Sequence, residues 1–138
     1  TLKFGVQISP FEEYLKYESY LPDTDGQHAV VRRLRGVTRN AEFYRNLKAA
    51  LAVVHDKPYD LNPIDWIIAE GRQLGFKPPA VRQRTDTFWC SALVGFMLVR
   101  LKVMPEDTDW TYLAPSDFAG QDKPFLDPPV RVTSATRL

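Results

Sequence analysis

The chain contains 138 residues, of which 44% are hydrophobic and 25% are charged, so it can bury the core of one domain. Its formal net charge of +1 excludes a strong overall attraction to nucleic acid or to an anionic membrane. Its single cysteine excludes an internal disulfide, and its longest apolar run, residues 92–99, is too short to cross a bilayer. We therefore expect one domain over residues 1–138 and no membrane span.

The first residues predict a strand followed by a short helix. Phe4, Val6 and Ile8 alternate with small or polar residues, which is the period of a half-buried strand. A Ser-Pro pair then supplies the capping residue and the first position of a helix that we expect to run to about Tyr17. Because the chain opens inside this strand without an initiator methionine, we expect the domain to lack its N-terminal strands.

The next segment predicts a second strand and a longer helix. Residues 28–35 contain apolar positions separated by arginines, which is typical of a strand with one solvated face. Asn40 is a favourable N-cap, and the helix predicted from there to about His55 has apolar residues at the spacing of one buried face. These residues are Phe43, Leu47, Ala50, Leu51 and Val54. Pro58 is expected to end this helix, because proline disfavours helical geometry in the residue before it.

The second half predicts two further helices and a short tail of strands. An Asn-Pro pair at 62–63 opens a shorter helix, and residues 71–84 are expected to form a loop. A helix predicted over residues 88–103 is apolar on every side, so we expect it to be buried and to stop at Pro105. The tail over residues 125–132 is expected to hold one or two short strands. Because strands and helices occur in separate runs, the predicted fold class is α+β.

Cys90 is expected in the first turn of the helix predicted over residues 88–103, after a Thr87 cap. The partial positive charge at a helix N-terminus favours the thiolate, which is the nucleophilic form of cysteine. The position therefore suits a catalytic nucleophile. The alternative is that Cys90 is a small buried hydrophobic residue with no chemical role.

Two motifs resemble those of the NlpC-type papain-like thiol hydrolases. One is a Lys-Pro-Tyr run that ends at Tyr59, and the other is an aromatic-x-Cys-Ser-x-Leu-Val run that begins at Phe88. By this resemblance Cys90 is the nucleophile, and the Tyr59 hydroxyl holds the substrate or the oxyanion. Trp89 flanks the nucleophile and binds substrate, and the backbone N–H of Ser91 donates to the oxyanion.

Three further runs, residues 5–15, 105–110 and 115–118, resemble the circularly permuted branch of that superfamily, including its members in large DNA viruses. The resemblance implies a papain-like α+β domain whose buried nucleophile helix packs on a small antiparallel sheet. It implies a peptidase, amidase or acyltransferase that forms a thioester with a peptide, amide or acyl-ester substrate and uses no cofactor and no metal. It also implies a cytoplasmic or virion-associated protein, with other virion proteins as partners and no specific nucleic acid.

The sequence does not identify a catalytic histidine. No histidine follows Cys90, and neither His28 nor His55 occupies the upstream strand that the resemblance requires. His28 also suits a surface strand residue, and His55 a favourable charge near a helix C-terminus. Three interpretations stay open: the base lies upstream of this chain, it is one of these two residues, or the fold has lost catalysis and serves as a virion, minor capsid or assembly module.

Nucleic-acid binding is a weaker alternative. It would need a basic face built jointly by Arg32, Arg35, Arg82 and Arg84. Because most runs of arginine are solvated faces, the sequence favours the thiol hydrolase.

Overall fold

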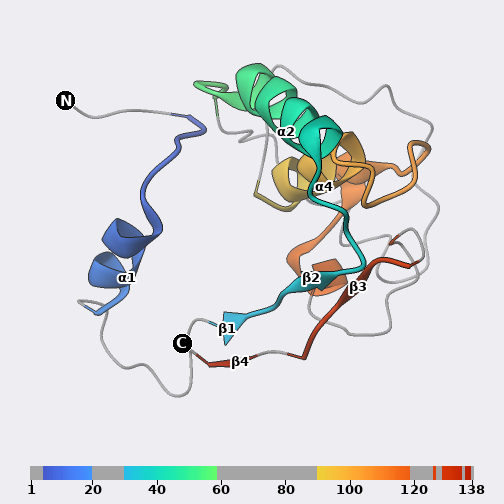
Figure 1. Cartoon of the computed structure of the whole chain (residues 1–138). Helices are drawn as coiled ribbons and strands as arrows, with labels where there is room; N and C mark the ends of the chain where they lie inside the picture. Colours follow the sequence, from blue (N-terminus) through green and yellow to red (C-terminus); the bar gives the residue numbers. More distant parts are fainter. Residues whose placement is uncertain are drawn as a thin grey trace.

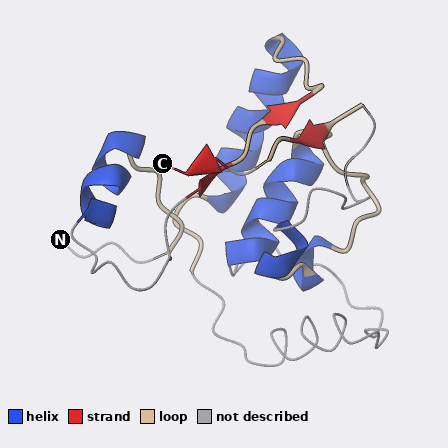
Figure 2. Ribbon diagram, turned by 90° about the horizontal axis from the view of Figure 1, so that it is seen from below, coloured by secondary structure: helices blue, strands red, loops and turns tan. Residues whose placement is uncertain are grey.

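The computed structural model describes residues 5–19, 30–58, 90–118, 126, 129–134 and 136–137. Within these residues the chain forms three α-helices, two short 3-10 helices and four short strands (Figures 1 and 2). In chain order they are α1 (Phe11–Ser19), β1 (Val30–Val31), β2 (Leu34–Arg35), α2 (Ala41–Val54), α4 (Cys90–Arg100), η1 (Trp110–Tyr112), η2 (Pro115–Phe118), β3 (Arg131–Val132) and β4 (Thr136–Arg137). The described part is a small mixed α+β structure, which confirms the predicted class.

Helices α2 and α4 pack against each other in opposite directions. Glu42 in the first turn of α2 pairs with Lys102, just beyond the end of α4, with 2.6 Å between Oε1 and Nζ. Figure 1 shows the same arrangement, since the colours run from teal to green along α2 and from yellow to orange along α4 in opposite directions. The start of α4 therefore lies at the same end of the pair as the end of α2. The buried cluster around them contains Ala50, Val54, Ala92, Phe96, Met104, Trp110 and Leu113.

The start and the buried face of α2 are as predicted. The Asn40 side chain accepts a hydrogen bond from the Phe43 N–H at 3.0 Å, which satisfies one of the free amides of the first turn. Ala50 and Val54 are buried, and the other residues of the predicted apolar face are half-buried. Local capping and apolar spacing are sufficient to place this helix.

Helix α2 ends at Val54, as the predicted end at about His55 required, but the end is a turn that precedes Pro58. The helix passes into a type II turn, in which His55 has φ −55° and ψ 133° and Asp56 has φ 59°. The Lys57 N–H closes this turn by donating to the Val54 carbonyl at 3.0 Å. The turn thus ends the helix before Pro58 by placing a non-glycine residue in the left-handed region.

Proline does not end α4 either. Lys102 lies in the left-handed region with φ 59°, and its N–H donates to the Val99 carbonyl at 3.0 Å. The Val103 N–H donates to the Leu98 carbonyl at 2.9 Å. These two bonds form a Schellman motif, which satisfies carbonyls at the helix end. The helix therefore stops at Arg100, before the predicted boundary at residue 103.

The chain after α4 folds back against this helix and contributes much of the core. The Phe96 and Trp110 rings pack edge to face, with centroids 5.3 Å apart and planes at 71°. Gly95 allows the close approach, because a Cβ there would lie 2.9 Å from Trp110 Cβ and would also clash with Leu113. Trp110, the last residue of the run 105–110 that carries part of the resemblance, therefore packs directly against α4.

The strands form two separate antiparallel pairs, β1 with β4 and β2 with β3. The single strand predicted over residues 28–35 is thus two short strands within the residues described, and both take partners from the C-terminal tail. Figure 1 shows the tail running beside β1 and β2. The register shifts by one residue between the two pairs, so the tail has one extra residue between Thr133 and Thr136.

The strand predicted at the N-terminus is wrong for residues 5–8, which have no strand geometry. Val6 instead donates to the Lys57 carbonyl at 2.8 Å and accepts from the Asp56 N–H at 3.0 Å. Ile8, predicted to be half-buried, is 61% exposed. The backbone of Val6 is therefore bound to the turn after α2, and the alternation of side chains does not mark a sheet.

The other local predictions have mixed outcomes. The first helix extends to Ser19, slightly beyond the predicted end. The tail contains strands as expected, but β4 lies beyond the predicted range. The helix predicted after 62–63 and the loop predicted over 71–84 lie outside the described residues.

Candidate functional site

Cys90 is the first residue of α4, and it is exposed. The residues that follow, Ser91 and Ala92, are 3% and 2% exposed. Cys90 thus lies in the first turn of α4, as predicted, but the helix is only partly buried, since Val94 is 44% exposed. The arrangement presents the sulfur to solvent at the positive end of a helix that the core holds in place.

The turn after α2 lies at the same end of the helix pair as Cys90. This follows from the antiparallel packing of α2 on α4, because the pair of Glu42 with Lys102 marks the opposite end. Val54, the last residue of α2, belongs to the same buried cluster as Ala92 in the first turn of α4. The segment that leads to Tyr59 thus reaches the end of α4 that bears the thiol.

Two of the predicted site residues, Tyr59 and Trp89, lie outside the described residues, so their roles stay predictions. Ser91 is the second residue of α4, and its N–H belongs to the first four amides of the helix, which have no acceptor within the helix. Its hydroxyl is buried and has no hydrogen-bond partner among the described residues. The position of the Ser91 amide meets the requirement for an oxyanion donor.

His55 forms a pair that the sequence reasoning did not anticipate. Its Nδ1 lies 2.9 Å from Asp56 Oδ2, and the Gln7 side-chain amide donates to Asp56 Oδ1 at 3.1 Å. A carboxylate on Nδ1 orients an imidazole and leaves Nε2 to act on another group. No hydrogen bond in the described part of the chain joins His55 to Cys90. His28, the other candidate base, lies outside the described residues.

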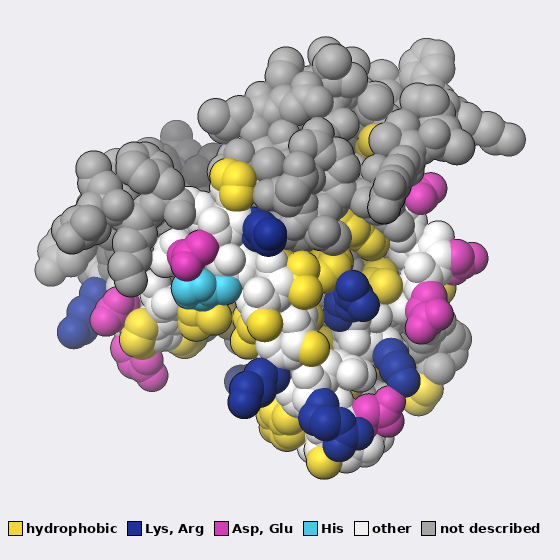
Figure 3. Space-filling view, turned by 90° about the horizontal axis from the view of Figure 1, so that it is seen from above, with side chains coloured by type: hydrophobic (Ala, Val, Ile, Leu, Met, Phe, Trp, Pro, Cys, Tyr) yellow, Lys and Arg dark blue, Asp and Glu magenta, His cyan; other side chains and the backbone are white. Residues whose placement is uncertain are grey.

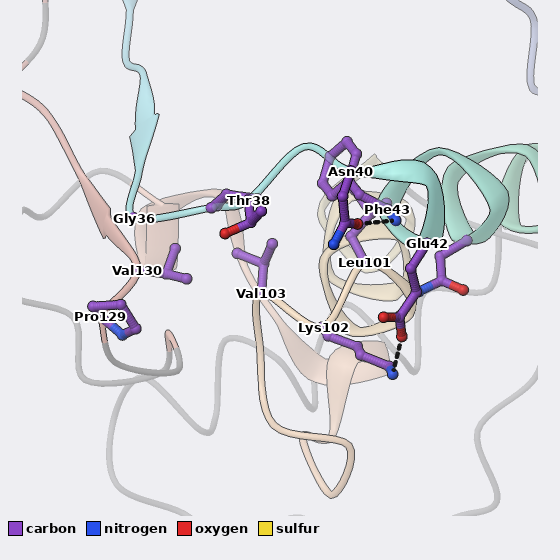
Figure 4. Close-up of a pocket in the computed structure, with 12 residues that line it drawn as sticks. Gly36, Thr38, Asn40, Glu42, Phe43, Leu101, Lys102, Val103, Pro129 and Val130 are labelled. Atoms are coloured by element: carbon purple, nitrogen blue, oxygen red, sulfur yellow. Dashed lines mark hydrogen bonds and ion pairs between the residues drawn. The ribbon is translucent and has the colours of Figure 1, made fainter.

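Two cavities lie away from Cys90. One, of about 290 Å³, is formed by the start of α2, the residues after α4 and the residues next to β2 and β3 (Figure 4). The other, of about 450 Å³, is lined by Asn46, Phe96, Val99, Arg100, Lys102, Glu106 and Trp110. Two of its charged groups are engaged with neighbours: Arg100 lies 5.2 Å from the centre of the Phe96 ring, and Lys102 pairs with Glu42. Neither cavity is lined by Cys90 or His55.

The described residues contain no group of three or more histidine, cysteine, aspartate or glutamate side chains that could hold a metal ion. Among the helices in this part of the chain, none is long and apolar enough to span a membrane.

The pair of Glu42 with Lys102 predicts a pH dependence of stability. The hydrogen bond and the charge of Lys102 lower the pKa of Glu42 below 4.5, and the same contacts raise the pKa of Lys102 above 10.5. The Glu42 contribution is present above pH 4.5 and is lost as the pH falls through the lowered pKa. The Lys102 contribution is present below pH 10.5 and is lost as the pH rises through the raised pKa.

We therefore expect Glu42→Gln to lower the melting temperature slightly near pH 7, because both side chains are largely exposed. The difference from wild type should disappear well below pH 4.5, where both proteins carry a neutral group at this position. Thermal melting from pH 3 to pH 8 measures it. A difference that is the same at every pH would show that the carboxylate charge does not contribute.

Comparison of the chain with protein-family models, with curated proteins and with solved structures gave no match.

Proposed function

We propose that this chain is a papain-like thiol hydrolase of the NlpC type, in circularly permuted order, with Cys90 as its nucleophile. The observation that carries the proposal is the exposed sulfur at the first residue of a helix whose following residues are buried. A nucleophile on a rigid element keeps its geometry during reaction, and free amides at the same helix end are available to an oxyanion.

The reaction begins when the Cys90 thiolate attacks the carbonyl carbon of a peptide, amide or acyl ester. The carbonyl oxygen becomes an oxyanion, and amides of the first turn of α4, such as that of Ser91, stabilise it. Collapse of this intermediate expels the amine or alcohol, which must receive a proton, and leaves a thioester on Cys90. Water or another acceptor then resolves the thioester.

Proton transfer requires a base near Cys90, and His55 is the histidine that the described residues place at this end of the helix pair. Its pairing with Asp56 has the form of a base held by an orienting carboxylate. Because no hydrogen bond in the described part of the chain joins His55 to Cys90, we expect a histidine from outside the described residues to be the main base. The position of Cys90 at a helix start does not by itself supply a proton to the leaving group.

Acylation of Cys90 tests the proposal directly. The protein is incubated with p-nitrophenyl acetate, and its peptides are analysed by mass spectrometry. We expect one acetyl group on Cys90 and an initial release of p-nitrophenol that does not exceed one equivalent of protein. Cys90→Ser, shown by circular dichroism to be folded, is the control. Acetylation spread over lysines, with equal release from the variant, would contradict a nucleophilic Cys90.

A virion or assembly module is the second candidate, and one observation favours it. Ile8, Phe11, Tyr14 and Leu15 are between 37% and 61% exposed, and the Phe11 and Tyr14 rings stack on each other with centroids 6.1 Å apart. These residues form an apolar surface along α1 that a protein partner would cover. This function gains support if Cys90 fails to react with acyl substrates.

A further inference from the structure

The paired strands β2 and β3 present three exposed arginines on one face. Arg35 lies directly opposite Arg131 in the register of the two strands, and opposite residues of an antiparallel pair project to the same side. Arg33 is two residues before Arg35, so it shares that face. Thr133 keeps Arg33 in the ladder, since the Thr133 N–H donates to the Arg33 carbonyl and the Arg33 N–H donates to the Thr133 hydroxyl, both at 2.9 Å.

Exposure along the strands agrees with this assignment. Arg33, Arg35 and Arg131 are exposed, whereas Leu34 and Val132 between them are half-buried. We call the three exposed residues the arginine face. The sequence suggested a basic face made of other arginines, but Arg32 is half-buried and precedes Arg33, and the remaining two lie outside the described residues. Only the pairing with the C-terminal tail brings Arg131 into position.

The arginine face carries positive charge that none of the described carboxylates neutralises. Within the described part of the chain, no carboxylate lies at ion-pair distance from these three guanidinium groups. Like charges directly opposite each other destabilise an antiparallel pair. An anion bound across Arg35 and Arg131 would remove this repulsion.

We propose that the arginine face binds the phosphodiester backbone of a nucleic acid strand without reading its sequence. Opposite residues lie about 5 Å apart, and same-face residues along a strand lie roughly 6.6 Å apart. Each strand of duplex DNA carries one charge per roughly 3.4 Å of axis, so a nucleic acid backbone offers more than one phosphate to a face of this size. An extended acidic peptide can match the spacing of Arg33 and Arg35 along one strand, and competition with polyglutamate distinguishes the two ligands.

Arginine suits this ligand because its planar fork donates two parallel hydrogen bonds to phosphate oxygens. Thr133 and Ser134 lie in the adjoining tail, but the face carries no aromatic residue on which a base would stack. The chemistry therefore favours contacts to the backbone over recognition of bases. This activity is independent of Cys90.

Binding of the full chain to a fluorescein-labelled oligothymidylate tests the proposal, measured by anisotropy at several salt concentrations. Three phosphate contacts on a single strand give a slope of about −2 for the logarithm of the binding constant against that of the salt concentration. In the triple variant Arg33→Gln, Arg35→Gln, Arg131→Gln the slope should change from about −2 to about 0. The variant should also bind at least about tenfold more weakly than wild type at low salt. The triple variant with lysine at the same positions should keep the slope but bind more weakly than wild type, because it keeps the charges and loses the forks.

A matched control removes three exposed charges elsewhere: Arg39→Gln, Arg45→Gln and Lys48→Gln, at and along α2. Figure 3 shows basic side chains interspersed with acidic and hydrophobic ones on one side of the molecule. Because the three control residues are not part of the arginine face, this control should keep most of the affinity. Equal losses in the control and in the arginine-face variant would reduce the effect to net charge and overturn the proposal. A wild-type slope near zero would also overturn it.

Competition with polyglutamate identifies the class of ligand. The oligothymidylate should resist displacement at equal concentrations of charge, and efficient displacement would assign the face to an acidic protein partner instead. The melting temperature of each variant shows whether it is folded. The glutamine variants should melt at the same temperature as wild type or higher, because they remove the repulsion between Arg35 and Arg131. If the triple variant does not fold, Arg131→Gln alone should reduce the slope by about 0.7, and an unchanged slope would overturn the proposal.

Discussion

Replacing Cys90 by serine is expected to reduce acyl transfer by this chain to the rate of buffer alone. A serine hydroxyl at the helix start remains protonated and needs a base in contact with it, whereas a thiol ionises readily near neutral pH. No hydrogen bond in the described part of the chain connects His55 to Cys90. The wild-type rate should therefore depend on the sulfur and respond weakly to His55.

The corresponding measurement is the rate of p-nitrophenol release between pH 6 and pH 9 for wild type, Cys90→Ser and His55→Ala. General acid–base catalysis typically contributes roughly 10²–10⁴-fold, so we expect His55→Ala to change the rate by less than tenfold. Added imidazole should accelerate the wild-type reaction beyond its effect on Cys90→Ser, because it supplies the base externally. A loss of about 100-fold or more in folded His55→Ala would contradict this expectation and assign the base to His55.

Among the substitutions considered for their effect on stability, those at Gly95 are expected to lower the free energy of unfolding most. The new Cβ would lie 2.9 Å from Trp110 Cβ, an atom next to the backbone, and it would clash with the Leu113 side chain. Overpacking of this kind costs about 1–3 kcal/mol, and the better helix propensity of alanine offsets up to about 1 kcal/mol. We therefore expect Gly95→Ala to lower the free energy of unfolding by about 1–2 kcal/mol, and Gly95→Val to lower it further.

Urea unfolding measures these changes, and Val94→Ala is the control because Val94 is the neighbouring residue of α4 and is 44% exposed. This control should stay within about 0.5 kcal/mol of wild type. Combining Gly95→Ala with Leu113→Ala should cost less than the sum of the single substitutions, because the second removes part of the clash. A neutral or stabilising Gly95→Ala would contradict the close approach of α4 to η1.

Interactions between residues near in sequence account for the predictions that succeeded. The Asn40 side chain caps the amide of Phe43, three residues along, and apolar residues at helical spacing identify the buried face of α2. The position of Cys90 at a helix start likewise agrees with the apolar run after it, whereas Thr87, the predicted cap, lies outside the described residues. These signals involve only a few consecutive residues, so they are visible in the sequence alone.

The candidate site was predicted only in part, because some of its contacts join residues that are far apart in the sequence. The sequence predicted Cys90 and Ser91 at the helix start. It predicted for His55 only a favourable charge near a helix C-terminus or a candidate base, with no partner. Its Asp56 partner is the next residue in the chain, so an adjacent His-Asp pair was a signal that was available. Its second neighbour, Gln7, arrives from a distant segment through the backbone contacts of Val6 with the turn.

The sequence by itself determined where α1, α2 and α4 begin, that the class is α+β, and that a lone cysteine opens an apolar helix. The structure decided how α2 and α4 end, because Asp56 and Lys102 adopt left-handed conformations, which are uncommon for residues other than glycine. It also decided that residues 5–8 form no strand and that Arg131 lies opposite Arg35. The last two features depend on hydrogen bonds between segments far apart in the chain, Val6 with the turn after α2 and β2 with β3, and no local pattern of residues encodes which segments will meet.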